Sequence, residues 1–321
     1  MQAGVRIALT IAFPLAMLTT AADAFDIQGH RGARGLAPEN SLPAFVRALE
    51  AGVTTLELDC GVTRDGVVVI SQDRVLNPDL TRDAHGRWLE APGPPIAQLA
   101  FADLQRYDVG RVKPGSEYAR RFPRQNGIDG VRMPRLADLF ALVRERGNNT
   151  VRFNIETKIS PEAVHETTSP ENFVRALLSV IREAHLESRV VIQSFDWRTL
   201  QLVQKEAPAI PTAYLTAERT SPRNISSGTA WTAGYKVEDF NGSVPKLVRA
   251  AGGAIWSPYH GDLTVERVRE AKALQLKVIP WTVNTDADMR RLIAWGVDGL
   301  ISDYPDLLVE VVKATRADVT R

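Results

Sequence analysis

Acidic side chains recur at a spacing of two residues in two strand-like stretches of the sequence. Glu57 and Asp59 flank Leu58, and Glu156 precedes Lys158 at the same spacing. Side chains two residues apart on a strand share one face, so the members of each pair point the same way. Carboxylates that gather on one face repel each other, and a hard divalent cation with oxygen ligands relieves that repulsion. Glu57, Asp59 and Glu156 are therefore candidate ligands for Ca²⁺ or Mg²⁺, with ordinary ion pairs to arginine or lysine as the alternative.

Basic side chains accompany these carboxylates at the ends of predicted strands. His30 and Arg31 follow the strand-like stretch at residues 26–29, and Lys158 follows Glu156. A guanidinium group can bind two phosphate oxygens at once, and an ammonium group binds them as a point charge. Arg31 and Lys158 therefore suit an anionic group beside the carboxylates, with solvated charges at the rim as the alternative.

Nine segments have the composition of β-strands, and most are separated by stretches with helical periodicity. The clearest helical stretches are residues 42–51, 171–184, 197–206 and 265–274. The predicted strands are residues 26–29, 54–60, 67–70, 151–156, 189–193, 212–215, 254–256, 277–282 and 299–301. Strands that alternate with helices predict parallel βαβ units in an α/β fold.

One of the nine strands does not fit a parallel sheet. Residues 54–60 and 67–70 are joined by a short connection that contains Asp65-Gly66, whereas a parallel pair needs a dozen or more connecting residues. Because Asp-Gly is a strong hairpin signal, residues 67–70 are expected to return antiparallel. The other eight strands predict a (β/α)8 TIM barrel, which typically has about 250 residues.

The segments outside this pattern are expected to be loops or insertions. Residues 74–135 contain repeated prolines and are predicted to form a small inserted subdomain over the barrel mouth, after the second strand and its hairpin. Residues 219–244 are expected to form a second long loop. Residues 25–321 then make up a single barrel domain.

The first 24 residues have the features of a secretory signal peptide. Arg6 gives a positive start, residues 7–18 are apolar, and residues 22–24 supply the small-x-small pattern before Phe25. The apolar run is shorter than the stretch of about 20 residues that a transmembrane helix needs. We therefore expect export to the periplasm with no stable membrane anchor, and an uncleaved anchor is the alternative.

The composition of the chain excludes several classes of protein. With 321 residues, 44% hydrophobic and 24% charged, it is ordinary for a globular protein. Thirty-nine Lys and Arg against 38 Asp and Glu give a net charge of +1, which does not call for nucleic acid or an anionic membrane as partner. The single cysteine, Cys60, rules out an intramolecular disulfide and a multi-cysteine zinc site.

The motifs occur in an order that resembles the glycerophosphodiester phosphodiesterase family. The matching motifs are His30-Arg31-Gly32, Pro38-Glu39-Asn40-Ser41, Glu57-x-Asp59, Glu156-x-Lys158, Gln193-Ser194-Phe195, Trp281-Thr282-Val283-Asn284 and Asp303-x-Pro305. The similarity extends from about Ile27 to Asp306. It implies a barrel with an insertion after the second strand, one divalent metal ion, and hydrolysis of glycerophosphodiesters to sn-glycerol 3-phosphate and an alcohol.

The resemblance also implies roles for individual residues around the metal. Glu57, Asp59 and Glu156 would be the metal ligands. Arg31 and Lys158 would hold the phosphate.

Further roles concern the substrate and the loop after the first strand. His30 would be one of the two acid/base histidines of the family. Trp281 would form a wall beside the glycerol, or else be a core aromatic. Glu39 and Asn40 would shape the loop, or else cap the helix that follows.

The sequence departs from the family at its second histidine. The family has a His-Asp pair after the hairpin strand, where this chain has Gln72 and Asp73. Pairing around a two-residue loop at 65–66 predicts that Gln72 lies opposite Asp59, at the metal site. An amide forms hydrogen bonds but does not exchange a proton near neutral pH. One positioned acid or base contributes about 10²–10⁴-fold, so Gln72 is expected to slow or alter the reaction.

Three functions follow from this pattern. The first is a metal-dependent phosphodiesterase of reduced or altered activity, in which His260 or His85 could replace the missing histidine. The second is a catalytically silent barrel that binds glycerophosphodiesters or other phosphate esters. The third is a lysophospholipase D-like activity, which a large apolar surface on residues 74–135 would favour.

Overall fold

The computed structural model describes residues 24–226 and 230–319 of the chain. The predicted signal peptide therefore lies, except for Ala24, outside the described residues. None of the helices in these two ranges combines the length and the apolarity of a bilayer-spanning segment.

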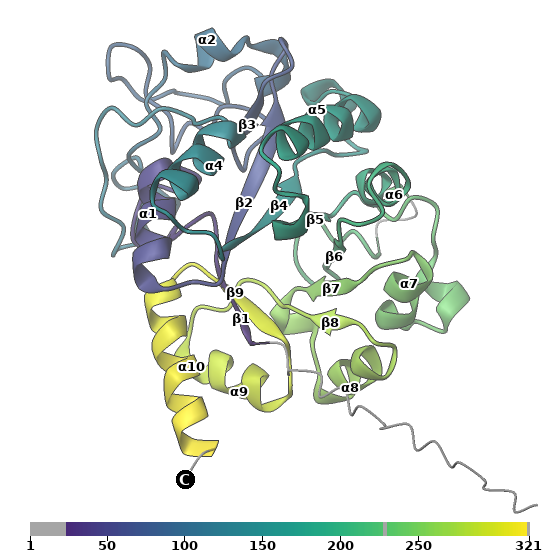
Figure 1. Cartoon of the computed structure of the whole chain (residues 1–321). Coiled ribbons are helices and arrows are strands. Elements are labelled where there is room, and N and C mark those ends of the chain that lie inside the picture. The colour runs from purple at the N-terminus through teal and green to yellow at the C-terminus, as the bar shows by residue number, and fades with distance from the viewer. Residues whose placement is uncertain (1–23, 227–229, 320–321) are drawn as a thin grey trace, which may run out of the picture.

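A single sheet of nine strands forms the centre of the molecule (Figure 1). Eight strands run parallel in the order β8-β7-β6-β5-β4-β2-β1-β9, and β3 pairs with β2. The strands are β1 (Asp26–Gly29), β2 (Thr55–Val62), β3 (Val68–Ile70), β4 (Arg152–Thr157), β5 (Val190–Ser194), β6 (Thr212–Thr216), β7 (Ile255–Pro258), β8 (Lys277–Val278) and β9 (Gly299–Ser302).

The two edges of this sheet, β8 and β9, are joined through the segment that follows β8 in the sequence. Val283 N donates to Ile301 O at 2.9 Å, and Ile301 N donates to Pro280 O at 3.1 Å. These bonds join the segment after β8 to β9, so the eight parallel strands form a nearly closed barrel. The predicted TIM barrel is confirmed. Strand β8 is shorter than the predicted 277–282, and Pro280, which has no N–H, interrupts it.

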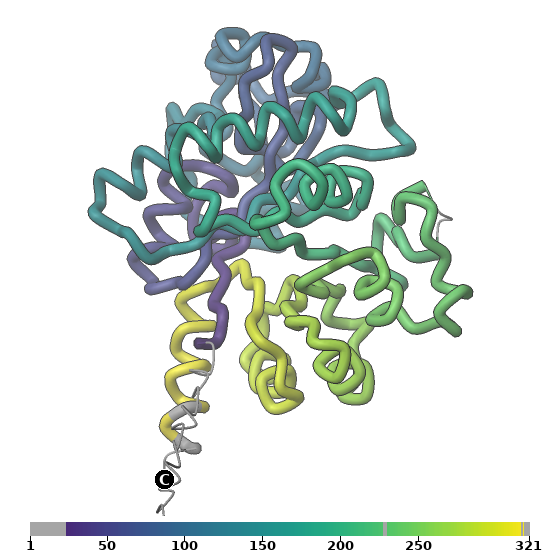
Figure 2. The backbone as a smooth tube through the Cα atoms, turned by 45° about the vertical axis from the view of Figure 1, so that its right-hand side comes forward, coloured from purple at the N-terminus to yellow at the C-terminus, as the bar shows by residue number. Residues whose placement is uncertain are grey.

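Helices form the layer outside the barrel (Figures 1 and 2). They are α1 (Leu42–Ala51), α2 (Phe101–Leu104), α3 (Glu117–Arg121), α4 (Leu136–Glu145), α5 (Pro170–Glu183), α6 (Trp197–Glu206), α7 (Val244–Ala250), α8 (Val265–Ala273), α9 (Asp286–Ala294) and α10 (Pro305–Val319). Of these, α2 and α3 belong to the long segment that follows β3.

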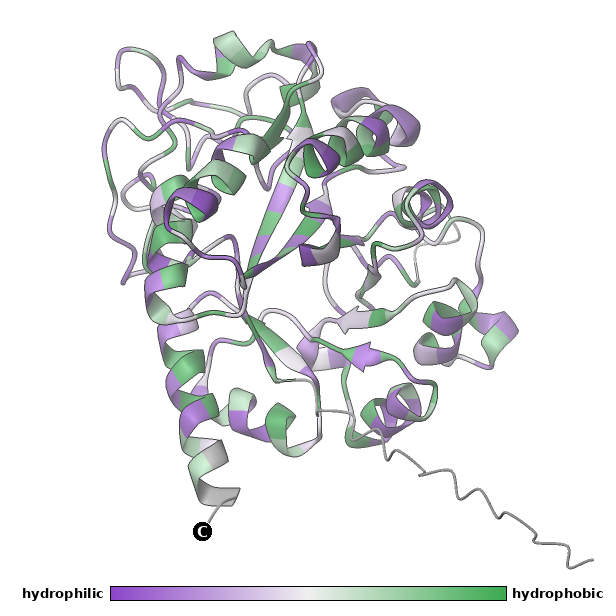
Figure 3. Ribbon diagram, in the orientation of Figure 1, coloured by the Kyte–Doolittle hydropathy of each residue, from purple (hydrophilic) through white to green (hydrophobic). Residues whose placement is uncertain are grey.

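Helix α5 illustrates how the sequence forms this outer layer. Ser169 caps its N-terminus by accepting a hydrogen bond from Asn172 N, and Pro170 occupies its first turn, where no N–H is needed. Its buried residues are Phe173, Val174, Leu177, Leu178 and Ile181. This spacing places them in one apolar stripe that faces the barrel. In Figure 3 the helix is therefore green at its hydrophobic residues and purple at its hydrophilic ones.

The β2–β3 hairpin is antiparallel, as predicted, but its register differs from the predicted one. Cys60 pairs with Ile70, which places every pair one residue out of the expected alignment. Thr63 N donates to Val67 O, and Gly66 N donates to Thr63 O. Gly66 has a φ of +83°, in the left-handed region. The connection is therefore a three-residue loop with a left-handed glycine, a common alternative to the two-residue turn.

This register changes the position of Gln72. Ser71 N donates to Asp59 O at 2.9 Å, so Ser71 is the residue opposite Asp59. The prediction that Gln72 lies opposite Asp59 was wrong. Strand β3 ends at Ile70, and the chain bends over residues 72–74. The direction of the Gln72 side chain is therefore not set by the alternation of side chains along a strand.

Residues 74–135 extend from the end of the hairpin and contain α2, α3 and the short helix η1 (Ile96–Gln98). A small apolar cluster holds this segment to β3: Val69, Leu76, Ile96, Leu104 and Met133. A polar centre accompanies it, in which Asp108 accepts hydrogen bonds from Arg82 and from the backbone of Gly110 and Gly130. Figures 1 and 2 show this segment at the end of the molecule away from the C-terminus.

Candidate active site

A polar cavity of about 490 Å³ opens at the carboxyl ends of the barrel strands. This is the end at which TIM barrels carry their functional groups. Its lining includes residues of β2, β4, β5, β6 and β9 and of the loops that follow the strands. The segment 74–135 also reaches the cavity, with Arg74, Val75 and Arg121 in its lining.

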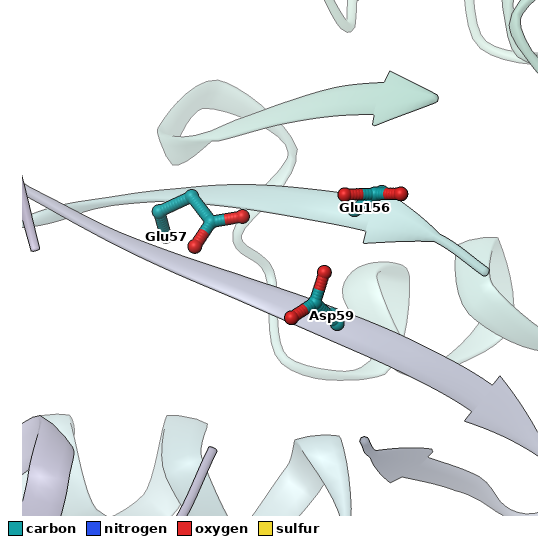
Figure 4. A group of neighbouring side chains, drawn as sticks. All are labelled: Glu57, Asp59 and Glu156. Carbon is teal, nitrogen blue, oxygen red and sulfur yellow. The ribbon is translucent and has the colours of Figure 1, made fainter. Parts of the chain in front are cut away.

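Three carboxylates gather at this cavity (Figure 4). Glu57 and Asp59 come from β2 and Glu156 from the adjacent β4, where Asp59 and Glu156 are paired in register. Each offers an oxygen, and these oxygens lie within 4.8 Å of one another. All three residues are buried. The predicted set of metal ligands is thus brought together in one cluster.

The cluster fits a hard divalent cation. Every donor is a carboxylate oxygen, which is the ligand type of Ca²⁺ and Mg²⁺. Asp59 Oδ1 is buried and accepts no hydrogen bond among the described residues, and Lys158 Nζ lies 3.7 Å from it, beyond hydrogen-bond distance. A buried oxygen of this kind is costly unless a positive group faces it. The residues present therefore suit the ion that the family resemblance implies.

The electrostatics of the cluster support the same conclusion. Burial, followed by repulsion from Asp59, raises the pKa of Glu57 well above its ordinary value. Burial also raises the pKa of Glu156 to about 7. Burial alone would raise the pKa of Asp59 as well, but Lys158 and Arg31 lower it to about 2. Three buried carboxylates in one place are unfavourable as anions without a cation.

Hydrogen bonds fix the orientation of Glu57. Gln193 Nε2 donates to Glu57 Oε1 at 2.7 Å, and Arg31 N donates to Glu57 Oε2 at 2.8 Å. Gln193 is in turn held by Asn154, whose Nδ2 donates to Gln193 Oε1 at 2.9 Å. Gln193 stood in a predicted motif, but this function could not be predicted because it depends on the packing of β2, β4 and β5.

Asn40 has the same function for Asp59. Its Nδ2 donates to Asp59 Oδ2 at 2.9 Å. The residue that caps helix α1 is Ser41, whose Oγ accepts a hydrogen bond from Ala44 N. The alternative that Asn40 caps this helix is therefore wrong, and its side chain belongs to the site.

His30 lies beside the carboxylates and is anchored on its far side. Its Nδ1 lies 2.6 Å from Asp303 Oδ1, and its Nε2 lies 3.9 Å from Glu57 Oε2. Arg34 Nε also donates to Asp303 Oδ1, at 2.7 Å, and Asn284 Nδ2 donates to Asp303 Oδ2 at 2.7 Å. Asp303 is fully buried among these three partners.

This environment selects one form of the histidine. Burial, followed by the positive charge of Arg34, lowers the pKa of His30 to about 4 despite the attraction of Asp303. Arg34 and His30 hold the pKa of Asp303 far below its ordinary value although burial opposes this, so Asp303 is an anion. The neutral imidazole therefore donates from Nδ1 to Asp303, which leaves Nε2 unprotonated toward the cavity.

Arg34 and the role of Asp303 were missed in the sequence. Asp303 was recognised only as part of the last motif, and Arg34 was not singled out. The signal was present in Arg34 lying four residues after His30, one turn into the loop that follows β1. Closure of β9 against β1 is what brings Asp303 to this loop.

Arg31 and Lys158 line the cavity and pair with its carboxylates. Arg31 Nη1 donates to Glu39 Oε1 at 2.9 Å, and its Nε lies 3.3 Å from Asp59 Oδ2. Lys158 Nζ donates to Glu156 Oε1 at 2.7 Å. Burial would lower the pKa of Lys158, but Glu156 and Asp59 hold it above its ordinary value. Both side chains are cationic and stand beside the carboxylate cluster, not at a solvated rim.

Aromatic side chains form another part of the wall. Trp281 and Phe195 line the cavity and pack edge to face, with ring centroids 5.3 Å apart. Trp281 Nε1 donates to Ser257 O at 3.0 Å, which fixes the indole. Trp281 thus lines the cavity and also packs, half-buried, against a small apolar cluster of the barrel interior.

Gln72 lines the cavity, whereas neither candidate substitute histidine does. His260 begins the short helix η5 (His260–Asp262) and packs against Tyr259, outside the lining. His85 is exposed on a turn of the segment 74–135. Within the described ranges, His30 is the one histidine in the cavity wall.

Comparison with known proteins agrees with this geometry. The model of the glycerophosphoryl diester phosphodiesterase family matches residues 30–307. A glycerophosphodiester phosphodiesterase from Caldanaerobacter subterraneus is 28% identical over 284 residues, which cover 88% of this chain and 96% of that protein. One from Bacillus subtilis is also 28% identical, over 88% of this chain and 85% of its own length.

Solved structures show the same relationship. A crystal structure from Silicibacter pomeroyi, named as a glycerophosphoryl diester phosphodiesterase, has a TM-score of 0.80 and 35% sequence identity. The match covers 91% of this chain and 94% of that one. A phosphodiesterase from Oleispira antarctica, solved with the product sn-glycerol 3-phosphate, has a TM-score of 0.66 at 21% identity, and the match covers 90% of this chain and 96% of that one. The family match spans nearly the whole described barrel and all the predicted site residues. This chain belongs to the glycerophosphoryl diester phosphodiesterase family.

Proposed function

We propose that this chain hydrolyses glycerophosphodiesters to sn-glycerol 3-phosphate and an alcohol, with one Ca²⁺ or Mg²⁺ ion held by Glu57, Asp59 and Glu156. The observation that carries the proposal is the buried cluster of these carboxylates beside His30 in a barrel of this family. The product complex of the Oleispira antarctica protein supports the same substrate class. When bound, the cation would neutralise the carboxylates and polarise the phosphoryl oxygens.

The surrounding side chains would bind and orient the substrate. Arg31 and Lys158 would donate hydrogen bonds to the phosphate oxygens, because both are cationic and line the cavity. Trp281 and Phe195 would form an apolar wall against the carbon atoms of the glycerol.

His30 would act as the general base. Its Nε2 faces the cavity unprotonated, and its Nδ1 is held by Asp303 at 2.6 Å. It would accept the proton of the attacking water or hydroxyl group as that oxygen approaches phosphorus. Asp303 would stabilise the imidazolium that forms, without taking the proton itself.

Gln72 supports a second candidate function. It lines the cavity and cannot exchange a proton near neutral pH. A chain that binds glycerophosphodiesters without cleaving them would keep the carboxylate cluster and the cationic residues, as this chain does.

One assay separates the two functions. Release of sn-glycerol 3-phosphate from glycerophosphocholine would be measured with Ca²⁺ or Mg²⁺ and with a chelator, for the wild-type chain and for Gln72→His. Metal-dependent turnover by the wild type supports the phosphodiesterase. Turnover by Gln72→His alone, with no wild-type product from glycerophosphocholine or from the matching 4-nitrophenyl diester, supports the binding protein. Silence of both variants overturns the proposed substrate.

We also propose that the chain is exported and acts in the periplasm. Support comes from the charged start, apolar run and small-x-small pattern of residues 1–24. Expression of the full chain in a Gram-negative host tests this. A periplasmic product that begins at Phe25 is expected, and an unprocessed product in the membrane fraction would contradict it.

A further inference from the structure

The cavity contains a group that can accept a proton but no matching group to return one. His30 is the one histidine in the lining among the described residues, and its Nδ1 is bonded to Asp303. Only Nε2 is left for proton transfer. If it takes the proton of the nucleophile, it does not also protonate the departing oxygen on the other side of phosphorus, because an in-line displacement separates the two oxygens.

The other protic side chains of the cavity are already paired, would hold the metal, or are poor acids. Glu57 and Glu156 would be kept as carboxylates by the ion of the proposed function, and Thr220, Ser221 and Thr282 offer only hydroxyl groups. Lys158 Nζ is bonded to Glu156 at 2.7 Å, and Arg74 pairs with Glu166 at 2.7 Å. Guanidinium groups do not release protons in proteins. Gln72 supplies an amide, which can donate a hydrogen bond to the departing oxygen but leaves it unprotonated. The departing oxygen therefore leaves as an anion, whose charge the cation of the proposed function and the neighbouring cationic side chains would stabilise without protonating it.

We infer that this chain prefers substrates with a weakly basic leaving group, a phenol in a phosphodiester or a phosphate in a phosphoanhydride, over phosphodiesters that release a simple alcohol. The inference rests on the proposed function and specifies its substrate. The attacking oxygen forms a bond to phosphorus and gives its proton to His30 Nε2. The bond from phosphorus to the leaving oxygen breaks, and its electron pair departs with that oxygen as an anion. Solvent then removes the proton from His30.

The chemistry of leaving groups supports this preference. A simple alcohol has a pKa near that of bulk water, about 15.7. A phenol is far more acidic, with a pKa of about 10, as in tyrosine. A phosphate monoester loses its last proton at about 6. The two acidic groups leave as stable anions near neutral pH, and the alcohol does not.

Arg121 adds a second observation on the side where the leaving group would lie. The aromatic wall comes from the segments that follow β5 and β8. Gln72 and α3 instead follow the β2–β3 hairpin, on the other side of the barrel order. Arg121 in α3 lines the cavity, and its exposed guanidinium group lies 5.7 Å from the centroid of the Phe122 ring. Its positive charge suits an anionic leaving group such as a phosphate.

The test uses one phosphoryl group with graded leaving groups. sn-Glycerol 3-phosphate would be esterified with choline, phenol or 4-nitrophenol, or joined to a second phosphate as an anhydride. Release of sn-glycerol 3-phosphate gives kcat/KM for the wild type, for Gln72→His, and for the matched amide control Gln72→Asn. The ratio of each variant to the wild type cancels the intrinsic reactivity of each substrate.

A selective rescue is expected. Gln72→His should raise kcat/KM about 10²–10⁴-fold for the choline diester and less than about tenfold for the nitrophenyl diester and the anhydride. Gln72→Asn should show no such selective rise. A ratio that is equal across the series, or a wild type that cleaves the choline diester as fast as the phenyl diester, overturns the inference and leaves the proposed function standing. No product from any substrate, in any variant, overturns both.

Arg121→Gln distinguishes the two kinds of weakly basic leaving group. A selective loss of about tenfold on the anhydride, equivalent to one charged hydrogen bond, would identify the phosphate as the preferred group. An equal effect on the anhydride and the phenyl diester would mean that Arg121 contacts the phosphoryl group that both share, and the wild-type kcat/KM values then rank the two leaving groups. Either result supports the inference if the rescue by Gln72→His is selective.

Discussion

The imidazole of His30 and the carboxylate of Asp303 lie 2.6 Å apart, although 273 residues separate them in the sequence. Asp303 follows the last strand of the barrel and His30 follows the first, so the contact exists only where the barrel closes. Arg34 and Asn284 complete the shell of Asp303. The pairing of the first and last barrel strands thus orients the one histidine of the cavity wall within the described residues.

Asp303→Asn should reduce turnover by removing the anion that fixes His30. An amide could hold the imidazole in the wrong tautomer, with its proton on Nε2 instead of Nδ1. We expect kcat to fall by about 10²–10⁴-fold, with KM changed little, because the phosphate-binding residues remain. Steady-state kinetics would measure this, and Asp306→Asn, which removes the pair of a half-buried carboxylate with Arg124 outside the cavity lining, is the control. An unchanged kcat, with the fold intact, would show that Asp303 has no positioning role.

Binding of the metal should stabilise the fold through the carboxylate cluster. A ligand present at 100 times its Kd adds about 2.7 kcal/mol to the free energy of unfolding. We expect Ca²⁺ or Mg²⁺ to raise the Tm of the wild type, and a chelator to reverse the rise. Glu57→Gln should abolish the response, whereas the exposed Glu90→Gln should retain it. An equal rise in Glu57→Gln would place the ion elsewhere.

The amides that hold the carboxylates should matter for metal affinity. Asn40 donates to Asp59, and Gln193 donates to Glu57. Loss of such supporting partners typically costs about 10–100-fold in metal affinity. Asn40→Ala and Gln193→Ala should therefore bind Ca²⁺ or Mg²⁺ more weakly by this factor in titration calorimetry. Wild-type affinity in both variants would mean that the carboxylates are oriented by the backbone alone.

Asp108 should make the segment 74–135 sensitive to acid. Although burial opposes it, hydrogen bonds from Gly130 N, Gly110 N and Arg82 lower the pKa of Asp108 below its ordinary value. Its contribution to stability is therefore fully present above the unfolded pKa of about 3.9 and is lost as the pH falls toward the lower folded value. Asp108→Asn should lower the free energy of unfolding at pH 7 by about 1–3 kcal/mol and should lose less stability than the wild type below pH 4. Denaturant unfolding at several pH values measures this, and parallel curves for the two proteins would contradict it.

The sequence contained enough information for the barrel and for most of the site. Alternation of strands and helices predicted the eight parallel strands, because each βαβ unit has a local signature. Glu57 and Asp59 could be placed on one face from their spacing alone. Both predictions rest on periodicities that neighbouring residues enforce.

Features that depend on three-dimensional closure could not be predicted in the same way. The role of Asp303 required the contact between β1 and β9, and that of Gln193 required the packing of β5 beside β4. The register of the hairpin depended on whether Gly66 closes a two-residue or a three-residue loop, and Asp-Gly is compatible with both. A shift of one residue then moved Ser71 into the position expected for Gln72.

The most direct test of the account is the metal dependence of hydrolysis at the carboxylate cluster. Release of sn-glycerol 3-phosphate from the 4-nitrophenyl diester would be followed while Ca²⁺ or Mg²⁺ is titrated into metal-free wild type and into Glu57→Gln. The account predicts that wild-type activity rises with occupancy of one ion per chain and that Glu57→Gln remains inactive at the same ion concentrations. Hydrolysis that persists in the chelator, or that Glu57→Gln carries out at the wild-type rate, would contradict it.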